Sequence, residues 1–420
     1  MEKLIFTNAT LIDVDAGSRP NATITIAGER IQDVRFGPAR TVGKAEACID
    51  LKGRCVLPGL FNCHYHATYK GVGGGGGFMP IGMEASPALQ ALRAARHVAL
   101  ALDSGFTGVI SAGAPHAIDV ALKSAIEEGA IRGPRIMAGS RDVSTTAHSQ
   151  DLALPWHWPI DEAPGVNRCD GADQFRRGVR NEIKRGAEII KIFLTNGHAI
   201  PGLPAEMDLS RDELAAAIET AHQYGIKVRA HVAKREAIIT ALKLGLDVVD
   251  HGDGLDDACI DLILQKGAFL APSMLYPYRL GQLARGAYSD WNKANVEQML
   301  EVLPRANKAG VKLVLGDDYG AVPLEHGDYA DELDFYVNVA GIPPLDVLRW
   351  ATRNGAEMMG RGHELGTIRE GALADLIVVD GDPMADIRVM RQKEKIVAVL
   401  KGGRFEKNLL DHTLHEDLNR

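Results

Sequence analysis

The sequence predicts an α/β protein: a (β/α)8 TIM barrel with a small β-sandwich domain formed by the two chain ends. From about residue 85, a helix pattern, a glycine and a strand pattern recur six times, which is typical of a parallel sheet wrapped by helices. Polar residues follow many of these strands, and no G-x-G-x-x-G segment follows an early strand. Both observations favour a closed barrel over an open doubly wound sheet.

The two ends of the chain are predicted to be β-structure. Strand patterns at 4–9, 22–27 and 31–34 are separated by Gly, Asn and Asp, and strand patterns return at 366–368, 374–379 and 396–400. We therefore expect residues 1–57 and 361–407 to form the small β domain and residues 58–360 the barrel, with 408–420 as a polar C-terminal tail.

The six repeated units share a glycine between helix and strand, where a helix needs a left-handed residue at its C-terminus. Ser210 and Glu213 also form a capping box at one helix start. The units are 91–103 with 106–110, 174–185 with 188–194, 210–224 with 226–230, 235–244 with 246–249, 256–266 with 268–271, and 292–309 with 311–315.

Composition excludes several classes of function. The chain has 420 residues and a net charge of −8, so it lacks the basic stripe of a nucleic-acid-binding protein. No stretch reaches the roughly 18 apolar residues of a membrane span. Five cysteines without a C-x-x-C pair, and a start without a signal peptide's apolar core, predict a cytoplasmic protein. The expected partner is a small-molecule substrate, and the sequence leaves a homo-oligomer open.

His64 and His66 end an apolar strand pattern and predict a metal site. On a strand, residues two apart face the same side, so both imidazoles converge on one ion. Either histidine alone is more often structural than a ligand.

Lys191 lies within Ile189–Ile192, a strand pattern that reads as central and buried. An edge-strand lysine that points to water is the competing interpretation. A buried, neutral lysine is nucleophilic and can take up carbon dioxide as a carbamate, whose two oxygens can bridge two metals.

His231 and His251 end two consecutive strands and together predict a second metal site, although either alone could be a hydrogen-bonded core residue. Asp317 and Asp318 follow the last clear barrel strand. One of them can ligate metal and take the proton of an attacking water, while the other points away as a loop or capping residue.

Other segments are less specific. Gly73–Gly77 lacks the Gly-Lys-Ser/Thr of a phosphate loop and is interpreted as a loop over the barrel mouth. His148 and His198 lie on loops that could reach substrate, and a plain surface loop explains each equally well. Trp156-His157-Trp158 fits an apolar lid or a packing patch.

These motifs resemble the amidohydrolase superfamily, in particular its prolidase-like and imidazolonepropionase-related dipeptidases and amidases. The resemblance covers nearly the whole chain. It rests on the segments 57–66, 186–192, 228–231, 250–252, 316–318 and 366–376, which include Pro-Gly-Leu before His-x-His and a Gly-Asp-Asp similar to the family's Gly-Thr-Asp.

The resemblance implies two divalent ions, usually Zn²⁺, bridged by an N6-carboxylated Lys191. It places His64, His66 and Asp318 on one ion, and His231 and His251 on the other. It also implies that a metal-bridging hydroxide attacks a carbonyl while Asp318 moves the proton. Two segments depart from the dipeptidase pattern, Thr146-Ala147-His148 and Thr195-Asn196-Gly197-His198, and these put dipeptide specificity in doubt.

The expected function is therefore hydrolysis of the amide (C–N) bond of an N-acyl amino acid, a dipeptide or an aryl amide. A hydrolase of cyclic amides, lactones or carbamates is the alternative. A mononuclear deaminase fits less well because such relatives lack a bridging lysine, and a non-catalytic binding protein fits less well because all six ligand positions are filled.

Overall fold

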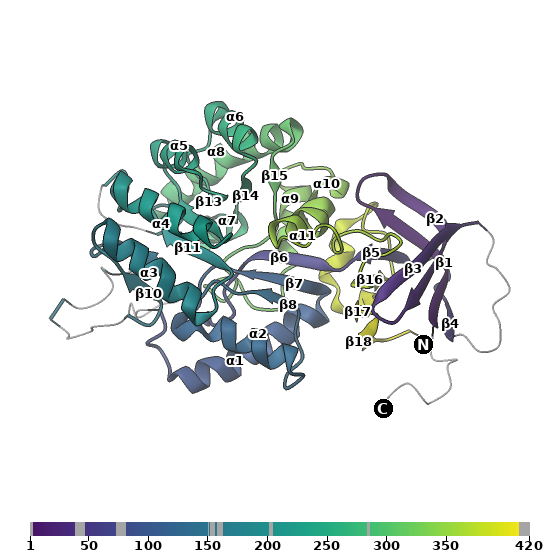
Figure 1. Ribbon diagram of the computed structural model, residues 1–420. Coiled ribbons are helices and arrows are strands. Elements are labelled where there is room, and N and C mark those ends of the chain that lie inside the picture. Colours follow the sequence, from purple (N-terminus) through teal and green to yellow (C-terminus); the bar gives the residue numbers. More distant parts are fainter. Residues whose placement is uncertain are drawn as a thin grey trace.

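The computed structural model describes residues 3–37, 47–72, 81–149, 151, 156–157, 163–200, 205–283 and 286–410. These residues form two parts that lie side by side (Figure 1). In one part, helices surround a set of parallel strands, and in the other, strands from both ends of the chain form a separate sheet. The predicted α/β class is confirmed.

One sheet joins the two chain ends. Its strand order is β18-β17-β16-β5-β1-β2-β3, with β4 beside β1. Strand β5 is parallel to β1 and antiparallel to β16, so it connects the early strands to the late ones. The β-sandwich arrangement expected for this domain stays a prediction. The strands are β1 (Lys3–Asp13), β2 (Gly17–Ala27), β3 (Arg30–Phe36), β4 (Ala47–Asp50), β5 (Cys55–Pro58), β16 (Leu376–Val379), β17 (Ile396–Lys401) and β18 (Arg404–Asn408).

The central strands of this sheet have two buried faces. Val56 and Val378 belong to the core of the sheet itself, whereas Leu57 and Ile377 belong to the larger core that also contains Leu102 of helix α1 (Pro87–Asp103). Successive strand side chains point to opposite faces, so alternate apolar residues serve the two cores. This packing fixes the sheet against the helical part of the molecule.

The remaining strands are parallel and form two sheets, β6-β7-β8 and β10-β9-β11-β12-β13-β14-β15. Two backbone hydrogen bonds run between the neighbourhoods of the two sheets: Cys63 N of β6 donates to Leu315 O, which follows β15, over 2.6 Å, and Glu188 N, which precedes β11, donates to Ala138 O, which follows β8, over 2.8 Å. The strands are β6 (Leu60–Tyr65), β7 (Phe106–Ser111), β8 (Arg135–Met137), β9 (Asp142–Ser144), β10 (Val166–Arg168), β11 (Ile189–Phe193), β12 (Lys227–Val232), β13 (Val248–His251), β14 (Phe269–Ala271) and β15 (Lys312–Leu313).

Helices connect these strands, and all six predicted helix–glycine–strand units are present. Gly186, Gly245, Gly267 and Gly310 end their helices with φ values of 111°, 103°, 66° and 90°, as a left-handed C-terminal residue requires. The α-helices are α1 (Pro87–Asp103), α2 (Ile118–Glu127), α3 (Ala172–Arg185), α4 (Arg211–Gln223), α5 (Arg235–Leu244), α6 (Asp257–Lys266), α7 (Leu275–Leu283), α8 (Ala287–Ala309), α9 (Asp331–Asn338), α10 (Pro344–Arg349) and α11 (Gly355–Met358). Short helical turns are η1 (Pro115–Ala117), η3 (Trp350–Asn354), η4 (Ile387–Arg391) and η5 (Lys393–Lys395).

Some predicted segments fall outside the described residues. Gly73–Gly77, Trp158 and residues 411–420 are among them. Trp156, which is described, is 94% exposed. Among the described helices, none has both the length and the apolar composition needed to span a bilayer.

Candidate metal centre

His64, His66 and Asp318 meet at the ends of their strands. His64 is the fifth residue of β6, His66 follows the end of that strand, and Asp318 lies beyond β15. The Nε2 atoms of both histidines are 3.3 Å from Asp318 Oδ1. Burial alone would raise the pKa of Asp318, but the two imidazoles hold it well below its ordinary value. The carboxylate is therefore ionised where two imidazoles face it.

Backbone and ring contacts orient His66. Its Nδ1 lies 3.0 Å from the carbonyl oxygen of Gly113, and its ring stacks on Tyr69 with the centroids 3.9 Å apart. A carbonyl only accepts, so Nδ1 carries the proton and Nε2 keeps a free lone pair. This is the tautomer that a metal ligand needs.

Gly316 allows β15 and β6 to approach each other closely. A Cβ added at this position would lie 2.2 Å from the backbone nitrogen of His64 and 2.8 Å from Asn62 Oδ1, and the φ of Gly316 is 151°. Only glycine fits such a close approach. The glycine in the sequence Gly316-Asp317-Asp318 thus brings Asp318 to the histidines.

His231 and His251 complete the cluster from strands β12 and β13. Their ring centroids are 4.3 Å apart, and that of His251 is 4.9 Å from His64. Burial holds the pKa of both imidazoles well below the ordinary value, which keeps them neutral. Among the described residues, His231 Nε2 and His251 Nδ1 are buried without a hydrogen-bond partner.

Lys191 lies at the centre of β11 and is 2% exposed. The edge-strand interpretation is wrong, because β11 pairs with both β12 and β9. Its Nζ lies 2.6 Å from Asp250 Oδ2, and Asp250 is also paired with Arg229. The lysine therefore points into the interior, toward the same strands that carry His231 and His251.

Asp317 and Asp318 have different partners. Asp317 Oδ2 accepts the amide protons of Leu275 and Tyr276 over 2.8 and 3.2 Å, and its Oδ1 accepts that of Asp318 over 2.8 Å. Burial, together with the charge of Asp318, raises the pKa of Asp317 to about 7. Asp317 thus holds the start of α7, while Asp318 faces the histidines.

His198 lies against the cluster. Its ring stacks on His251 with the centroids 3.8 Å apart, and its Nδ1 is 2.8 Å from Asp253 Oδ1. Its Nε2 is buried without a hydrogen-bond partner among the described residues, close to the carboxylates of Asp317 and Asp318. Burial works against a charged imidazole, but Asp253 raises the pKa of His198 above its ordinary value.

His148 is also buried, at 1% exposure, and lies one ring farther from the cluster. Its centroid is 5.6 Å from that of Phe193, which in turn stacks on His231 at 4.1 Å. Burial lowers the pKa of His148 to about 4. The plain surface-loop interpretation is thus wrong for both His148 and His198, since neither is exposed.

The donor set fits a metal. Ligand atoms of His64, His251 and Asp318 all lie within 4.8 Å of one another. Among the described residues, His231 Nε2, His251 Nδ1 and His198 Nε2 are buried without hydrogen-bond partners. Buried polar atoms normally have partners, so this pattern indicates a missing ligand. Neutral imidazoles combined with a carboxylate are a donor set that suits zinc.

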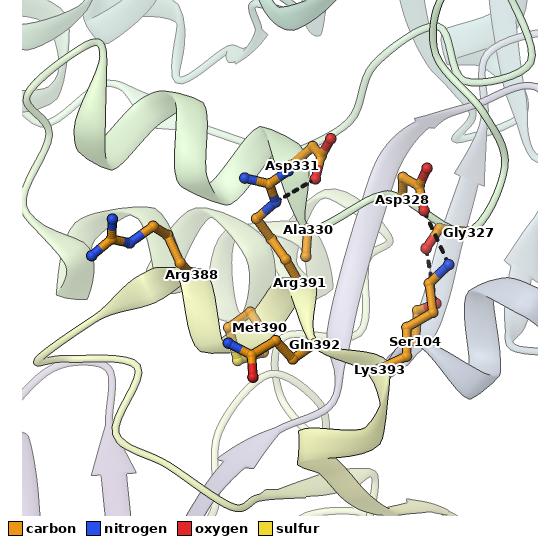
Figure 2. Close-up of a pocket in the computed structure, with 10 residues that line it drawn as sticks. All are labelled: Ser104, Gly327, Asp328, Ala330, Asp331, Arg388, Met390, Arg391, Gln392 and Lys393. Atoms are coloured by element: carbon orange, nitrogen blue, oxygen red, sulfur yellow. Dashed lines mark hydrogen bonds and ion pairs between the residues drawn. The ribbon is translucent and has the colours of Figure 1, made fainter.

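A cavity of about 450 Å³ lies elsewhere, beside η4, η5 and the start of α9 (Figure 2). Its charged side chains are paired with one another or with nearby groups: Arg391 with Asp331 at 2.7 Å, and Lys393 with Asp328 at 3.0 Å. None of the predicted site residues lines it. The cavity and the buried cluster are therefore separate features of the molecule.

Comparisons with known proteins decide the family. A family model described as "Amidohydrolase family" matches residues 55–405. The chain belongs to the amidohydrolase family. Ochratoxinase from Aspergillus niger is 30% identical to this amidohydrolase over 374 residues, which cover 84% of this chain and 75% of that protein. The predicted relationship to amidases and dipeptidases is confirmed.

Solved structures agree with this assignment. A Xaa-Pro dipeptidase with bound methionine has 26% identity and a TM-score of 0.85, covering 97% of this chain and 100% of that one. A prolidase complexed with N-methylphosphonate-L-proline has 28% identity and the same TM-score and coverage. This amidohydrolase is therefore a hydrolytic enzyme of a superfamily that acts on amide bonds.

Three residues of the site were missed by sequence reasoning. Arg229 precedes His231 by two positions and so shares its face of β12, which was a usable signal. Asp250 belongs to the segment 250–252 that carries the family resemblance, but no role was assigned to it, and Asp253 lies just outside that segment. Their importance depends on contacts with Lys191 and His198, which only the folded chain shows.

Proposed function

We propose that this amidohydrolase binds two divalent metal ions, usually zinc in such sites, and cleaves the amide bond of an N-acyl amino acid, a dipeptide or an aryl amide. The observation that carries the proposal is the convergence of His64, His66, His251 and Asp318, with His231 and Lys191 adjacent. His64, His66 and Asp318 would hold one ion, and His231 and His251 the other.

The proposal includes an N6-carboxylated Lys191 as the ligand shared by both ions. The neutral amine attacks carbon dioxide, an N–C bond forms, one proton leaves Nζ for solvent, and one N–H remains. The product carries two oxygens and one negative charge. Burial of Lys191 among the histidine-bearing strands supports this assignment.

The parallel strands would close into a (β/α)8 barrel between about residues 58 and 360. The hydrogen bonds from Cys63 to Leu315 and from Glu188 to Ala138 support closure, because each runs between residues at or next to strands of the two different sheets. In such a barrel the catalytic groups lie at the carboxyl ends of the strands.

When bound, the metals would lower the pKa of a water molecule and polarise the substrate carbonyl. The residues of the chain supply the proton transfer and the orientation. Asp318, ionised and 15% exposed at its side chain, would accept the proton of the attacking water and deliver it to the leaving nitrogen. His198, with Nδ1 held by Asp253, would present Nε2 to the substrate. His148 would be a second substrate contact.

A substrate panel tests the reaction class. The zinc-loaded enzyme is assayed with N-acyl amino acids, dipeptides, aryl amides and lactones, with Asp318→Asn as the matched inactive control. We expect turnover of at least one amide class that disappears in the variant. Turnover of lactones alone would instead support the ester-type alternative, and turnover that survives in Asp318→Asn would exclude the proposed proton transfer.

A further inference from the structure

Asp250 and Arg229 form a fully buried ion pair beneath the metal ligands. Both side chains are 0% exposed. In the sheet register, Arg229 lies opposite Lys191 and Asp250 lies opposite His231. A charge in the interior of a protein is costly unless its partners satisfy it. The pair therefore needs an explanation beyond packing.

Arg229 fixes the position of the Asp250 carboxylate. Its Nε and one terminal nitrogen donate to Oδ2 and Oδ1 over 3.0 and 2.6 Å, so the interaction is bidentate. Its other terminal nitrogen donates to the carbonyl oxygens of Cys63 and Ser111 over 2.8 and 3.1 Å. Because these carbonyls belong to β6 and β7, Arg229 ties the Asp250 carboxylate of β13 to two strands of the other parallel sheet.

Each oxygen of this carboxylate also faces one proposed ligand. Oδ2 lies 2.6 Å from Lys191 Nζ, and Oδ1 lies 3.5 Å from His64 Nδ1. Lys191 and His64 come from different strands, β11 and β6. A single carboxylate therefore lies next to two proposed ligands, Lys191 and His64. These ligands are 127 residues apart in the chain, which is the difference between positions 191 and 64.

Both proposed ligands need a hydrogen-bond acceptor beside them when they bind metal. A lysine carbamate keeps one N–H, and Asp250 Oδ2 is at hydrogen-bonding distance from that nitrogen. A histidine that binds metal through Nε2 carries its proton on Nδ1 and donates it to a neighbouring acceptor. Arg229 Nη2 lies 3.1 Å from His64 Nδ1 and can donate to it only while that nitrogen carries no proton. Once Nδ1 carries the proton, the acceptor that faces it is Asp250 Oδ1 at 3.5 Å.

We infer that Asp250, held in place by Arg229, is the positioning residue that aligns both the Lys191 carbamate and the His64 imidazole for metal binding. The inference rests on the proposed two-metal function. It assigns Asp250 a role toward the ligands, which differs from a role in stability alone. A purely structural ion pair would affect folding but leave the intrinsic metal affinity unchanged.

The test compares two Arg–Asp pairs in which the carboxylate is buried. Asp250→Asn breaks the pair beside the proposed ligands. Asp375→Asn breaks a pair elsewhere, in which Arg135 of β8, 25% exposed at its side chain, donates to Asp375 over 2.8 and 2.9 Å. Removing one partner of a buried ion pair leaves the other charge buried without a partner. The double variant Arg229→Gln/Asp250→Asn removes both charges and is therefore measured in parallel.

Two readouts are independent of turnover. One is the zinc affinity and stoichiometry of the folded protein, and the other is the ¹³C resonance of a carbamate after incubation with ¹³C-bicarbonate. In Asp250→Asn, an amide nitrogen replaces one acceptor oxygen, so at least one ligand loses its partner. We expect zinc affinity to fall about 10–100-fold in both Asp250 variants, with a weaker carbamate signal, while Asp375→Asn keeps both.

The outcomes separate the inference from the proposed function. Zinc affinity and carbamate signal at wild-type levels in the folded Asp250 variants would overturn the positioning role and leave the two-metal function standing. A wild-type enzyme without any carbamate would overturn the proposed function, and the inference with it. If neither variant folds, a crystal structure of the zinc-loaded wild type decides: Asp250 must contact both Lys191 Nζ and His64 Nδ1, and a carboxylate turned away from either contradicts the inference.

Discussion

Two regions of this amidohydrolase concentrate charged side chains, and they differ in burial. At the strand ends, Lys191 and Asp250 are at most 3% exposed at their side chains, and two imidazole nitrogens lack partners among the described residues. In the cavity of Figure 2, Arg391 and Lys393 are 42% and 48% exposed, and each has a carboxylate partner.

The difference in burial supports placing the proposed catalytic site at the strand ends. Exposed ion pairs contribute little energy and are common on surfaces. Buried ionisable groups are costly and are retained where they bind a ligand or perturb each other's pKa. The volume of a cavity therefore indicates the position of a catalytic site less well than buried donors and acceptors without partners do.

The largest expected effect comes from Asp318. Asp318→Asn removes the proton acceptor between His64 and His66, so kcat should fall about 10²–10⁴-fold, measured as steady-state hydrolysis of the best amide found in the panel. The control is Asp317→Asn, which disturbs the start of α7 and should lower thermal stability more than kcat. If Asp317→Asn is the inactive variant, the roles of the two aspartates are reversed.

The next effect concerns His198. Asp253→Asn removes the carboxylate that orients Nδ1 of His198. We expect kcat/KM to fall about 10-fold, because a hydrogen bond to a charged group contributes roughly the free energy of a tenfold change in rate. Zinc content should stay at the wild-type level. A loss of zinc instead of kcat/KM would place His198 among the metal ligands.

Asp208 tests whether every unsatisfied buried carboxylate marks function. Burial raises its pKa to about 6, against the opposing charge of Lys234, and its Oδ2 has no hydrogen-bond partner among the described residues. The folded protein therefore keeps a proton that the unfolded chain has already lost between pH 4 and 6. The free energy of unfolding contributed by this group falls as pH rises through that window.

Asp208→Asn should consequently be more stable than the wild type at pH 7, by about 1–2 kcal/mol after allowance for solvent screening of this half-buried group. The gain should vanish near pH 4. Urea unfolding at both pH values measures it, and kcat/KM should not change. A loss of activity would extend the site to Asp208.

The smallest effect is expected in the cavity. Arg391→Gln removes one exposed partner of Asp331 and Asp334, so the free energy of unfolding should change by less than about 1 kcal/mol and kcat/KM should be unaltered. A tenfold change in kcat/KM would contradict the division between the two regions.

Much of the fold could be predicted because its signals are local. A glycine after each amphipathic segment fixed the ends of helices such as α5 and α6, and those positions have left-handed φ values. Helix α2 and strand β8 were missed, because α2 starts without a side-chain cap and two glycines, Gly129 and Gly133, lie between the helix and the strand. Helices α9, α10 and α11, which lie between β15 and β16, carry no repeated unit and were also missed.

The site was partly predictable for the same reason. Strand-end residues such as His64 and His251 stand out by position alone. Arg229, Asp250 and Asp253 act through partners distant in sequence: Asp253 meets His198 across 55 residues and Asp250 meets Lys191 across 59. Only the parallel register of β11, β12 and β13 brings these groups together, and register is set by packing of the whole sheet.

The most direct test is the metal content of the purified enzyme, measured by plasma mass spectrometry on the wild type and on Lys191→Ala. We predict about two divalent ions per chain in the wild type, as a bridged pair requires, and fewer than about one in the variant, since the shared ligand is lost. A wild type that binds a single ion, or a Lys191→Ala variant that keeps two, would contradict the bridged two-metal centre.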